Sequence, residues 1–165
     1  MKWLTRLILL AGAIALGVWG WSYFFPSPQK VIEGDLLKLA RQASFTGPEG
    51  NFKKLAAMER IRSLLAENIH VVLGISEAHE QTFDNREELL RAALAARSAV
   101  KGLQAEFSQI NVIVNADHQT AVALLTLKAT IVDEADPIVA ELKFTLKKDN
   151  NDWLITRIEP VKALR

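Results

Sequence analysis

Hydrophobic positions divide the chain into an uninterrupted apolar start and a patterned remainder. The 19 residues Leu7–Phe25 carry no charge. As a helix they would extend over about 28 Å, close to the thickness of the hydrocarbon core of a bilayer. Aromatic residues crowd the end of this run, as at a membrane interface, and Pro26 then stops the helix. We predict that residues 1–28 are a transmembrane anchor with a short linker, and that residues 29–165 form a separate domain.

Two basic side chains suggest how the anchor would be oriented. Lys2 and Arg6 precede the apolar run, and no acidic residue occurs before Glu33. Basic flanks stay in the cytoplasm, so we expect a single-pass protein of the cell membrane, held through Leu7–Phe25, with its domain outside. In a Gram-negative cell that compartment is the periplasm. Two alternatives are a signal peptide that is cleaved to release a secreted domain, and a buried core helix.

Helical periodicity governs the first part of the domain. Apolar residues recur at helical spacing over Val31–Phe45 and again from Asn51 onward. A short β-rich run, Ile69–Ile75, comes next. A third helix should begin at Asp84, because Glu87 follows three residues later and the pair can form a capping box. Alanines make this third helix narrow, so it can approach a sheet closely.

From residue 103 the period changes to two, which predicts four strands at residues 103–114, 120–132, 138–148 and 153–161. The third strand alternates most clearly, with one apolar face and one polar face formed by Glu141, Lys143, Thr145 and Lys147. Short connections between the strands imply a meander of neighbours. We therefore expect an α+β domain in which three helices wrap a curved antiparallel sheet to form a cone, preceded by one transmembrane helix.

Composition narrows the function classes. The formal charge is +1, and without Lys2 and Arg6 there are 18 basic and 19 acidic residues. A body so close to neutral is not that of a strongly basic nucleic-acid binder, and we expect no nucleic-acid partner. The chain has no cysteine, which excludes disulfides, thiolate nucleophiles and cysteine-based zinc sites. We expect neither a cofactor nor a metal.

Three local strings resemble the nuclear-transport-factor-2-like superfamily, which is also called SnoaL-like. They are FDNREELLRAAL after a short strand, AELKFTLKK, and the closing NDWLITRIEPV with Trp153 near its start. The resemblance runs from Val31 to Val161. It implies a curved sheet wrapped by helices around a pocket, and dimerisation through the sheet in many members. The superfamily includes isomerases, dehydratases, polyketide cyclases and binding modules, so the resemblance does not select a function.

The residues that catalytic relatives use are largely missing. Such relatives place a Tyr, Asp or His inside the pocket, but Tyr23, the one tyrosine, lies in the predicted anchor. His70 is the remaining candidate for a general base, and its alternative is a hydrogen-bonded structural histidine. We predict that His70, Leu142, Phe144 and Trp153 line the pocket, with the direction of Trp153 left open. Other ionisable residues occupy predicted loops and turns: Glu77, His79, Glu80, Asp117, His118, Asp133, Asp136, Asp149 and Asp152.

These observations favour a membrane-anchored, non-enzymatic binding or interaction module exposed outside the cytoplasm. Its partners would be a small apolar ligand, another protein, or a second copy bound through the polar sheet face. The main alternative is a small-molecule isomerase or dehydratase that uses the cone pocket with His70 as base. A third is a small envelope assembly subunit whose anchor does more than tether the domain.

Overall fold

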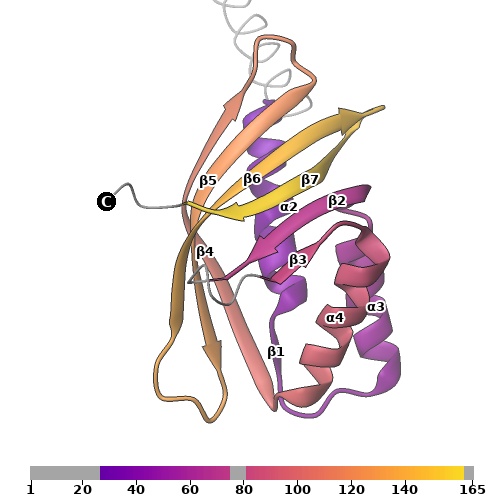
Figure 1. Ribbon diagram of the computed structural model, residues 1–165, viewed down its shortest axis with the longest axis vertical. Coiled ribbons are helices and arrows are strands. Elements are labelled where there is room, and N and C mark those ends of the chain that lie inside the picture. Colours follow the sequence, from indigo (N-terminus) through magenta and orange to yellow (C-terminus); the bar gives the residue numbers. More distant parts are fainter. Residues whose placement is uncertain (1–26, 75–80, 162–165) are drawn as a thin grey trace, which may run out of the picture.

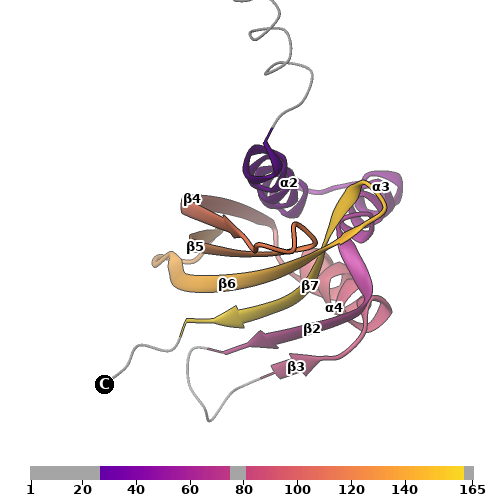
Figure 2. The ribbon, with the colours of Figure 1, turned by 90° about the horizontal axis from the view of Figure 1, so that it is seen from above.

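Three helices lie on one side of a curved seven-stranded sheet in the computed structural model, which describes residues 27–74 and 81–161 (Figures 1 and 2). The helices are α2 (Pro28–Ala43), α3 (Asn51–Arg62) and α4 (Arg86–Ala99). The strands are β1 (Phe45–Thr46), β2 (Leu65–Leu73), β3 (Gln81–Phe83), β4 (Gly102–Val114), β5 (Thr120–Ile131), β6 (Ile138–Asp149) and β7 (Asp152–Pro160). This arrangement confirms the predicted α+β class, the three helices and the curved sheet.

The predicted transmembrane helix lies outside the described residues. Within residues 27–74 and 81–161, no helix has the length and apolar character that crossing a membrane requires.

The sheet order is β1-β4-β5-β6-β7-β2-β3. Strands β4 to β7 are antiparallel neighbours in sequence order, which confirms the predicted meander. One pairing differs from the expected antiparallel sheet, because β2 runs parallel to β7. The sheet is therefore mixed, and the prediction of a wholly antiparallel sheet was wrong at this position. Alternation of side chains carries no information about strand direction. The direction of β2 depends instead on where the chain leaves α3 and begins the strand.

A single apolar core fills the space between the helices and the inner face of the sheet. Helix α2 contributes Ile32 and Leu36, which are fully buried. The sheet contributes Leu142, Phe144 and Leu146 from alternate positions of β6. The Phe144 ring packs edge to face on Phe107, with 5.8 Å between centroids. Helix α2 packs on β4, whereas α4 packs on β2 and β3 and on α3.

Helix α3 buries only part of the apolar stripe expected from its sequence, which consists of Phe52, Leu55, Ala56 and Ile61, followed by Leu64 and Leu65. Its apolar sequence positions include Phe52 and Leu55, but their exposed fractions are 85% and 60%. Ile61 of this stripe enters the core as expected, together with Ala57 and Met58. Both faces of this helix carry apolar residues, so periodicity by itself does not identify the buried one.

Helix α4 begins one residue later than expected. Asn85 is its N-cap, and the Asn85 side chain accepts a hydrogen bond from the backbone N–H of Glu88 at 2.8 Å. Asp84 instead contacts His70. Asp84 and Asn85 are both suited to capping. Because Asp84 contacts His70 on β2, Asn85 caps the helix.

The outer face of the sheet is polar with an apolar strip. Lys143 and Glu159 form an ion pair of 2.9 Å between β6 and β7, as expected for opposite charges on facing strands. Beside them lie two exposed apolar side chains, Leu124 opposite Lys143 and Ile113 opposite Val122. The alternation predicted for β6 is confirmed.

Candidate functional site

An apolar cleft lies between α3, α4 and the ends of β4 and β5. We call it the inner cleft; its volume is about 210 Å³. It is lined by Ala43, Phe45, Met58, Ile61, Ala93, Ala96, Arg97, Val100, Leu103 and Ile131. Among these described residues, only Arg97 has an ionisable side chain.

Small side chains on α4 keep the inner cleft open. Ala93 and Ala96 face it from successive positions on one side of the helix, where larger residues would occupy the space. The alanine-rich stretch was expected to let α4 approach the sheet closely. The structure shows a second consequence, which is a space between the helix and the sheet.

Arg97 is buried at the mouth of the inner cleft, and its side chain is 6% exposed. Its Nε and Nη2 atoms donate to the carboxylate of Glu49 at 2.7 and 3.1 Å. Its Nη1 atom donates to the carbonyls of Gln42 and Ala43 at 2.8 and 3.1 Å. These carbonyl groups belong to the last turn of α2, where backbone carbonyls have no hydrogen-bond donors within their own helix. Arg97 therefore ties α4 to the end of α2 and to the loop that follows.

The electrostatics of this pair favour the ionised form of Glu49. The hydrogen bond from Arg97 lowers the pKa of the Glu49 carboxyl, and the positive charges of Arg97, Lys53 and Lys54 act in the same direction. The guanidinium carbon of Arg97 also lies 4.4 Å from the centroid of the Phe45 ring. Glu49 is thus a charge partner for Arg97 and a weak proton acceptor.

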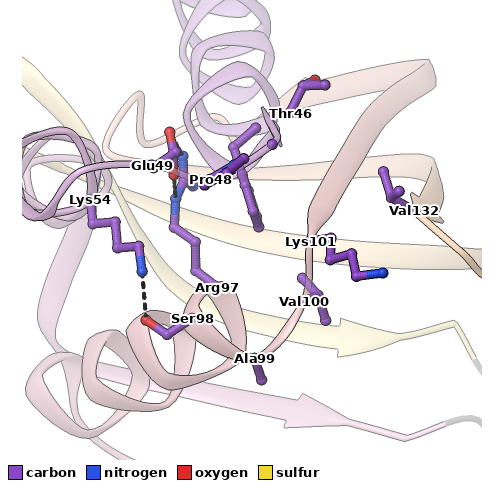
Figure 3. Close-up of a pocket in the computed structure, with 12 residues that line it drawn as sticks. Thr46, Pro48, Glu49, Lys54, Arg97, Ser98, Ala99, Val100, Lys101 and Val132 are labelled. Carbon is purple, nitrogen blue, oxygen red and sulfur yellow. Dashed lines mark hydrogen bonds and ion pairs between the residues drawn. The ribbon is translucent and has the colours of Figure 1, made fainter.

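A larger, more polar space adjoins the inner cleft. This space, which we call the vestibule, has a volume of about 600 Å³ (Figure 3). Phe45, Arg97 and Val100 line both spaces and form the boundary between them. Gly47, on the loop that rims the vestibule, has a φ of +72°, a conformation that side chains other than glycine rarely adopt.

Two lysines contribute positive charge to the vestibule. Lys54 on α3 donates to the hydroxyl of Ser98 on α4 at 3.2 Å (Figure 3). Lys101 pairs with Asp133 at 2.6 Å. The lining residues include three basic side chains (Lys54, Arg97 and Lys101) and one acidic one (Glu49). Arg97 and Lys101 each have a carboxylate oxygen within 4.0 Å. Among the described residues, no carboxylate oxygen lies within 4.0 Å of the Lys54 ammonium nitrogen.

The structure places the predicted pocket residues elsewhere. Leu142, Phe144 and Trp153 are buried at 8%, 1% and 4% exposure and belong to the apolar core. Trp153 points into the core together with Ile155, which resolves its direction. None of the three lines the inner cleft or the vestibule, and a ligand contact for them stays a prediction.

His70 lies apart from those three residues. On β2 it alternates with Ile69 and Val71, whose side chains are buried in the core, so His70 points to the opposite face. Its Nδ1 atom is 2.6 Å from Oδ1 of Asp84, and its side chain is 36% exposed. His70 lines neither the inner cleft nor the vestibule, and a catalytic role for it stays a prediction.

The other ionisable candidates lie in turns, at the ends of strands (Asp149 in β6 and Asp152 in β7) or outside the described residues. Glu77, His79 and Glu80 fall in the segment 75–80 that the structure does not describe. His118 is exposed in the β4–β5 turn, where Asp117 accepts hydrogen bonds from Gln119 and Thr120. Across residues 27–74 and 81–161, no three His, Asp or Glu side chains gather closely enough to hold a metal ion.

Sequence reasoning missed the residues that shape the mouth of the inner cleft. Glu49 falls in a stretch rich in Gly and Pro, which predicts a loop, and Arg97 lies near the end of α4, where a basic residue favours the helix dipole. The two are 48 residues apart, so no local pattern links them. The available signal was weak: a basic residue on an otherwise alanine-rich helix, and a glutamate between Gly and Pro residues.

Comparison with known proteins identifies the fold. No family model matches the chain, and neither does any curated protein. A protein of unknown function with a cystatin-like fold from Nostoc punctiforme PCC 73102 aligns over 82% of this chain and 91% of its own, with 13% identity and a TM-score of 0.62. A nuclear-transport-factor-2-like protein of unknown function from Pseudomonas putida KT2440 aligns over 86% and 90%, with 10% identity and a TM-score of 0.65.

A third solved structure carries a suggested activity. This candidate scytalone dehydratase from Novosphingobium aromaticivorans DSM 12444 aligns over 82% of this chain and 83% of its own, with 13% identity and a TM-score of 0.61. At such low identity the likeness concerns the fold and not the activity. The described chain therefore has the fold of nuclear-transport-factor-2-like and cystatin-like domains.

Proposed function

We propose that this protein is a membrane-anchored, non-enzymatic binding module whose domain lies outside the cytoplasm and takes a small apolar group into the inner cleft. One observation carries the proposal. The inner cleft is apolar, and its single ionisable side chain, Arg97, already donates to Glu49 and to the end of α2. Apolar walls favour burial of an apolar group, because that burial removes hydrocarbon surface from water.

The charges around the cleft argue for binding over acid–base catalysis. A general base works best when its pKa lies near the operating pH. The only carboxylate among the described residues that line either space is Glu49, and Arg97 lowers its pKa from the ordinary value of 4.5. Arginine side chains in general do not act as proton donors at physiological pH. Neither side chain is suited to exchange a proton with a substrate at neutral pH.

The position of the cleft fits a tethered domain. The predicted anchor ends at Phe25, and α2 begins at Pro28. The loop that rims the vestibule follows the other end of α2, about 24 Å away for a helix of 16 residues (Figure 1). A domain standing on the membrane at Pro28 would open its vestibule away from the bilayer. Its ligand would then arrive from the aqueous phase or from another protein.

The inner cleft can be tested by filling it. In an Ala93→Leu variant, added methyl groups would occupy the space, and we expect loss of any small molecule retained in native mass spectrometry of the full chain. Ala95→Leu is the matched control, because Ala95 is exposed on the same helix and lines neither space. Retention in Ala93→Leu, or equal loss in both variants, would contradict binding in the inner cleft.

The anchor needs its own test. We expect the full chain to resist extraction from membranes at alkaline pH, and a protease added outside the cytoplasmic membrane to cleave the domain. The intact mass of the mature protein distinguishes a retained anchor from a cleaved signal peptide. If the measured mass corresponds to a protein that begins near residue 26, the signal peptide is cleaved and the domain is secreted rather than anchored.

One observation favours a second candidate function, that of a small-molecule isomerase or dehydratase. The contact between His70 and Asp84 resembles the arrangement in which a carboxylate orients a histidine, so that its second nitrogen can accept a proton. Turnover of an enolisable or hydroxylated compound that His70→Ala abolishes, with the circular dichroism spectrum unchanged, would support this function. Turnover that survives the substitution would exclude His70 as the base.

A further inference from the structure

The vestibule has the charge pattern of a site for an anionic group. Of its three basic side chains, Arg97 is buried against Glu49, and Lys101 pairs with Asp133 while its side chain is 80% exposed to solvent. Lys54 donates one hydrogen bond to Ser98, and its ammonium group has two further N–H donors. Lys54 is therefore the half-buried cation among the described lining residues that has no carboxylate within 4.0 Å, and its charge faces the vestibule with less solvent screening than that of Lys101.

The inner cleft lies directly beside this charge. The two spaces share Phe45, Arg97 and Val100, so a ligand extending from one into the other passes the Phe45 ring. The volume of the inner cleft, about 210 Å³, is about seven times the share of one water molecule in the liquid. A methylene group is similar in size to a water molecule, so the cleft accommodates a chain or ring of about seven carbons.

We propose that the ligand is a short amphipathic carboxylic acid, whose apolar part occupies the inner cleft and whose carboxylate lies in the vestibule beside Lys54. This inference rests on the proposed binding function and adds the chemical class of the ligand. A medium-chain or aryl-substituted acid fits both volumes. It is also soluble in water, which matches a vestibule that opens away from the predicted anchor.

Three ligands with the same tail test the head group. Octanoate, octanol and octylammonium are equilibrated with the full chain in lipid nanodiscs, with empty nanodiscs as the blank, and bound ligand is quantified by mass spectrometry. We expect octanoate to bind about ten times more tightly than octylammonium. Lys54 attracts the carboxylate and repels the ammonium group, and both effects are moderate because the site is partly exposed. Octanol should bind with intermediate affinity.

Variants at the vestibule identify the charge that acts. Lys54→Met should weaken octanoate binding about fivefold, the upper range for a partly exposed ion pair, and leave octanol binding unchanged. Lys30→Met is the control, because Lys30 is exposed at the start of α2, the end of that helix away from the vestibule. Ser98→Ala removes the hydrogen bond to Lys54 without removing its charge, and should keep the preference for octanoate.

The possible results separate this inference from the proposed function. If octanol and octanoate bind equally, and Lys54→Met changes neither affinity, the cleft binds apolar groups and the inferred carboxylate site is wrong. A preference for octylammonium would also overturn it. If none of the three ligands binds above the nanodisc blank, or if Ala93→Leu binds them as well as the unmodified chain, the proposed binding in the inner cleft fails as well.

Discussion

At the scale of single residues, the Glu49–Arg97 pair dominates the mouth of the inner cleft. The side chains are 14% and 6% exposed, so each charge depends on the other for compensation. We predict that Glu49→Gln lowers the free energy of unfolding by about 3 kcal/mol, because it leaves the buried guanidinium without its counter-charge. Urea unfolding of residues 27–165 measures the loss. Glu33→Gln, at an exposed position on α2, is the control and should change little.

The same pair predicts a pH dependence. Because the pKa of Glu49 is lowered on folding, its ionised form stabilises the fold above the ordinary pKa of 4.5. That contribution declines as the pH falls below this value and through the lowered pKa. The stability difference between the unmodified chain and Glu49→Gln should therefore shrink as the pH is lowered from 7 to 3. A difference that stays constant over this range would mean that the Glu49 charge is not involved.

Gly102 lies at a position with too little space for a side chain. A Cβ atom at this position would lie 2.7 Å from Cγ2 of Val132 and 3.3 Å from the carbonyl oxygen of Phe45. We predict that Gly102→Ala destabilises the domain by about 1 kcal/mol, and that adding Val132→Ala recovers most of the loss. Gly34→Ala should have the opposite sign, with a gain of about 0.5–1 kcal/mol, because it lies within α2 with open space around it. Thermal unfolding of these three variants and the unmodified chain checks the pattern.

At the scale of elements, α3 shows how a helix with two apolar faces is oriented by its surroundings. Met58 packs in the core, and Phe52 is 85% exposed. We predict that Met58→Ala costs about 2–4 kcal/mol, as a cavity in a core does, and that Phe52→Ser changes stability by less than about 0.5 kcal/mol. Equal losses in urea unfolding would mean that the face carrying Phe52 is covered in solution.

At the scale of the whole molecule, the outer face of the sheet is the surface available to a second copy. It combines the exposed side chains of Ile113 and Leu124 with the ion pair between Lys143 and Glu159. We propose that two copies associate here, the partner arrangement expected from the resemblance. The chain has no cysteine, so a single introduced thiol reports on proximity without background.

Disulfide cross-linking in membranes tests this association. We predict that mild oxidation of Leu124→Cys gives a covalent dimer on a non-reducing gel. Phe52→Cys, an exposed position on α3 away from the sheet, should stay monomeric. A dimer formed equally by both variants would indicate random collision, and no dimer with Leu124→Cys would place the interface elsewhere.

Local patterns predicted most of the elements but few of the site residues. Strands β4 to β7 alternate over many residues, and that periodicity identified them. Strands β1 and β3 have two and three residues, too few for any period to appear. Of the predicted pocket residues, Leu142, Phe144 and Trp153 are core residues. Alternation identifies a buried face but does not distinguish a packed position from one beside a cavity.

The sequence by itself determined the order of the three helices and of strands β2 and β4 to β7, the alternation of β6 and the near-neutral charge of the domain, because each depends on neighbouring residues or on composition. Only the tertiary structure decided which face of α3 is buried, that β2 runs parallel to β7, and that Arg97 meets Glu49. These features depend on contacts between distant parts of the chain. The free energy of a buried charge is set by the groups that folding brings around it, and a local pattern does not contain them.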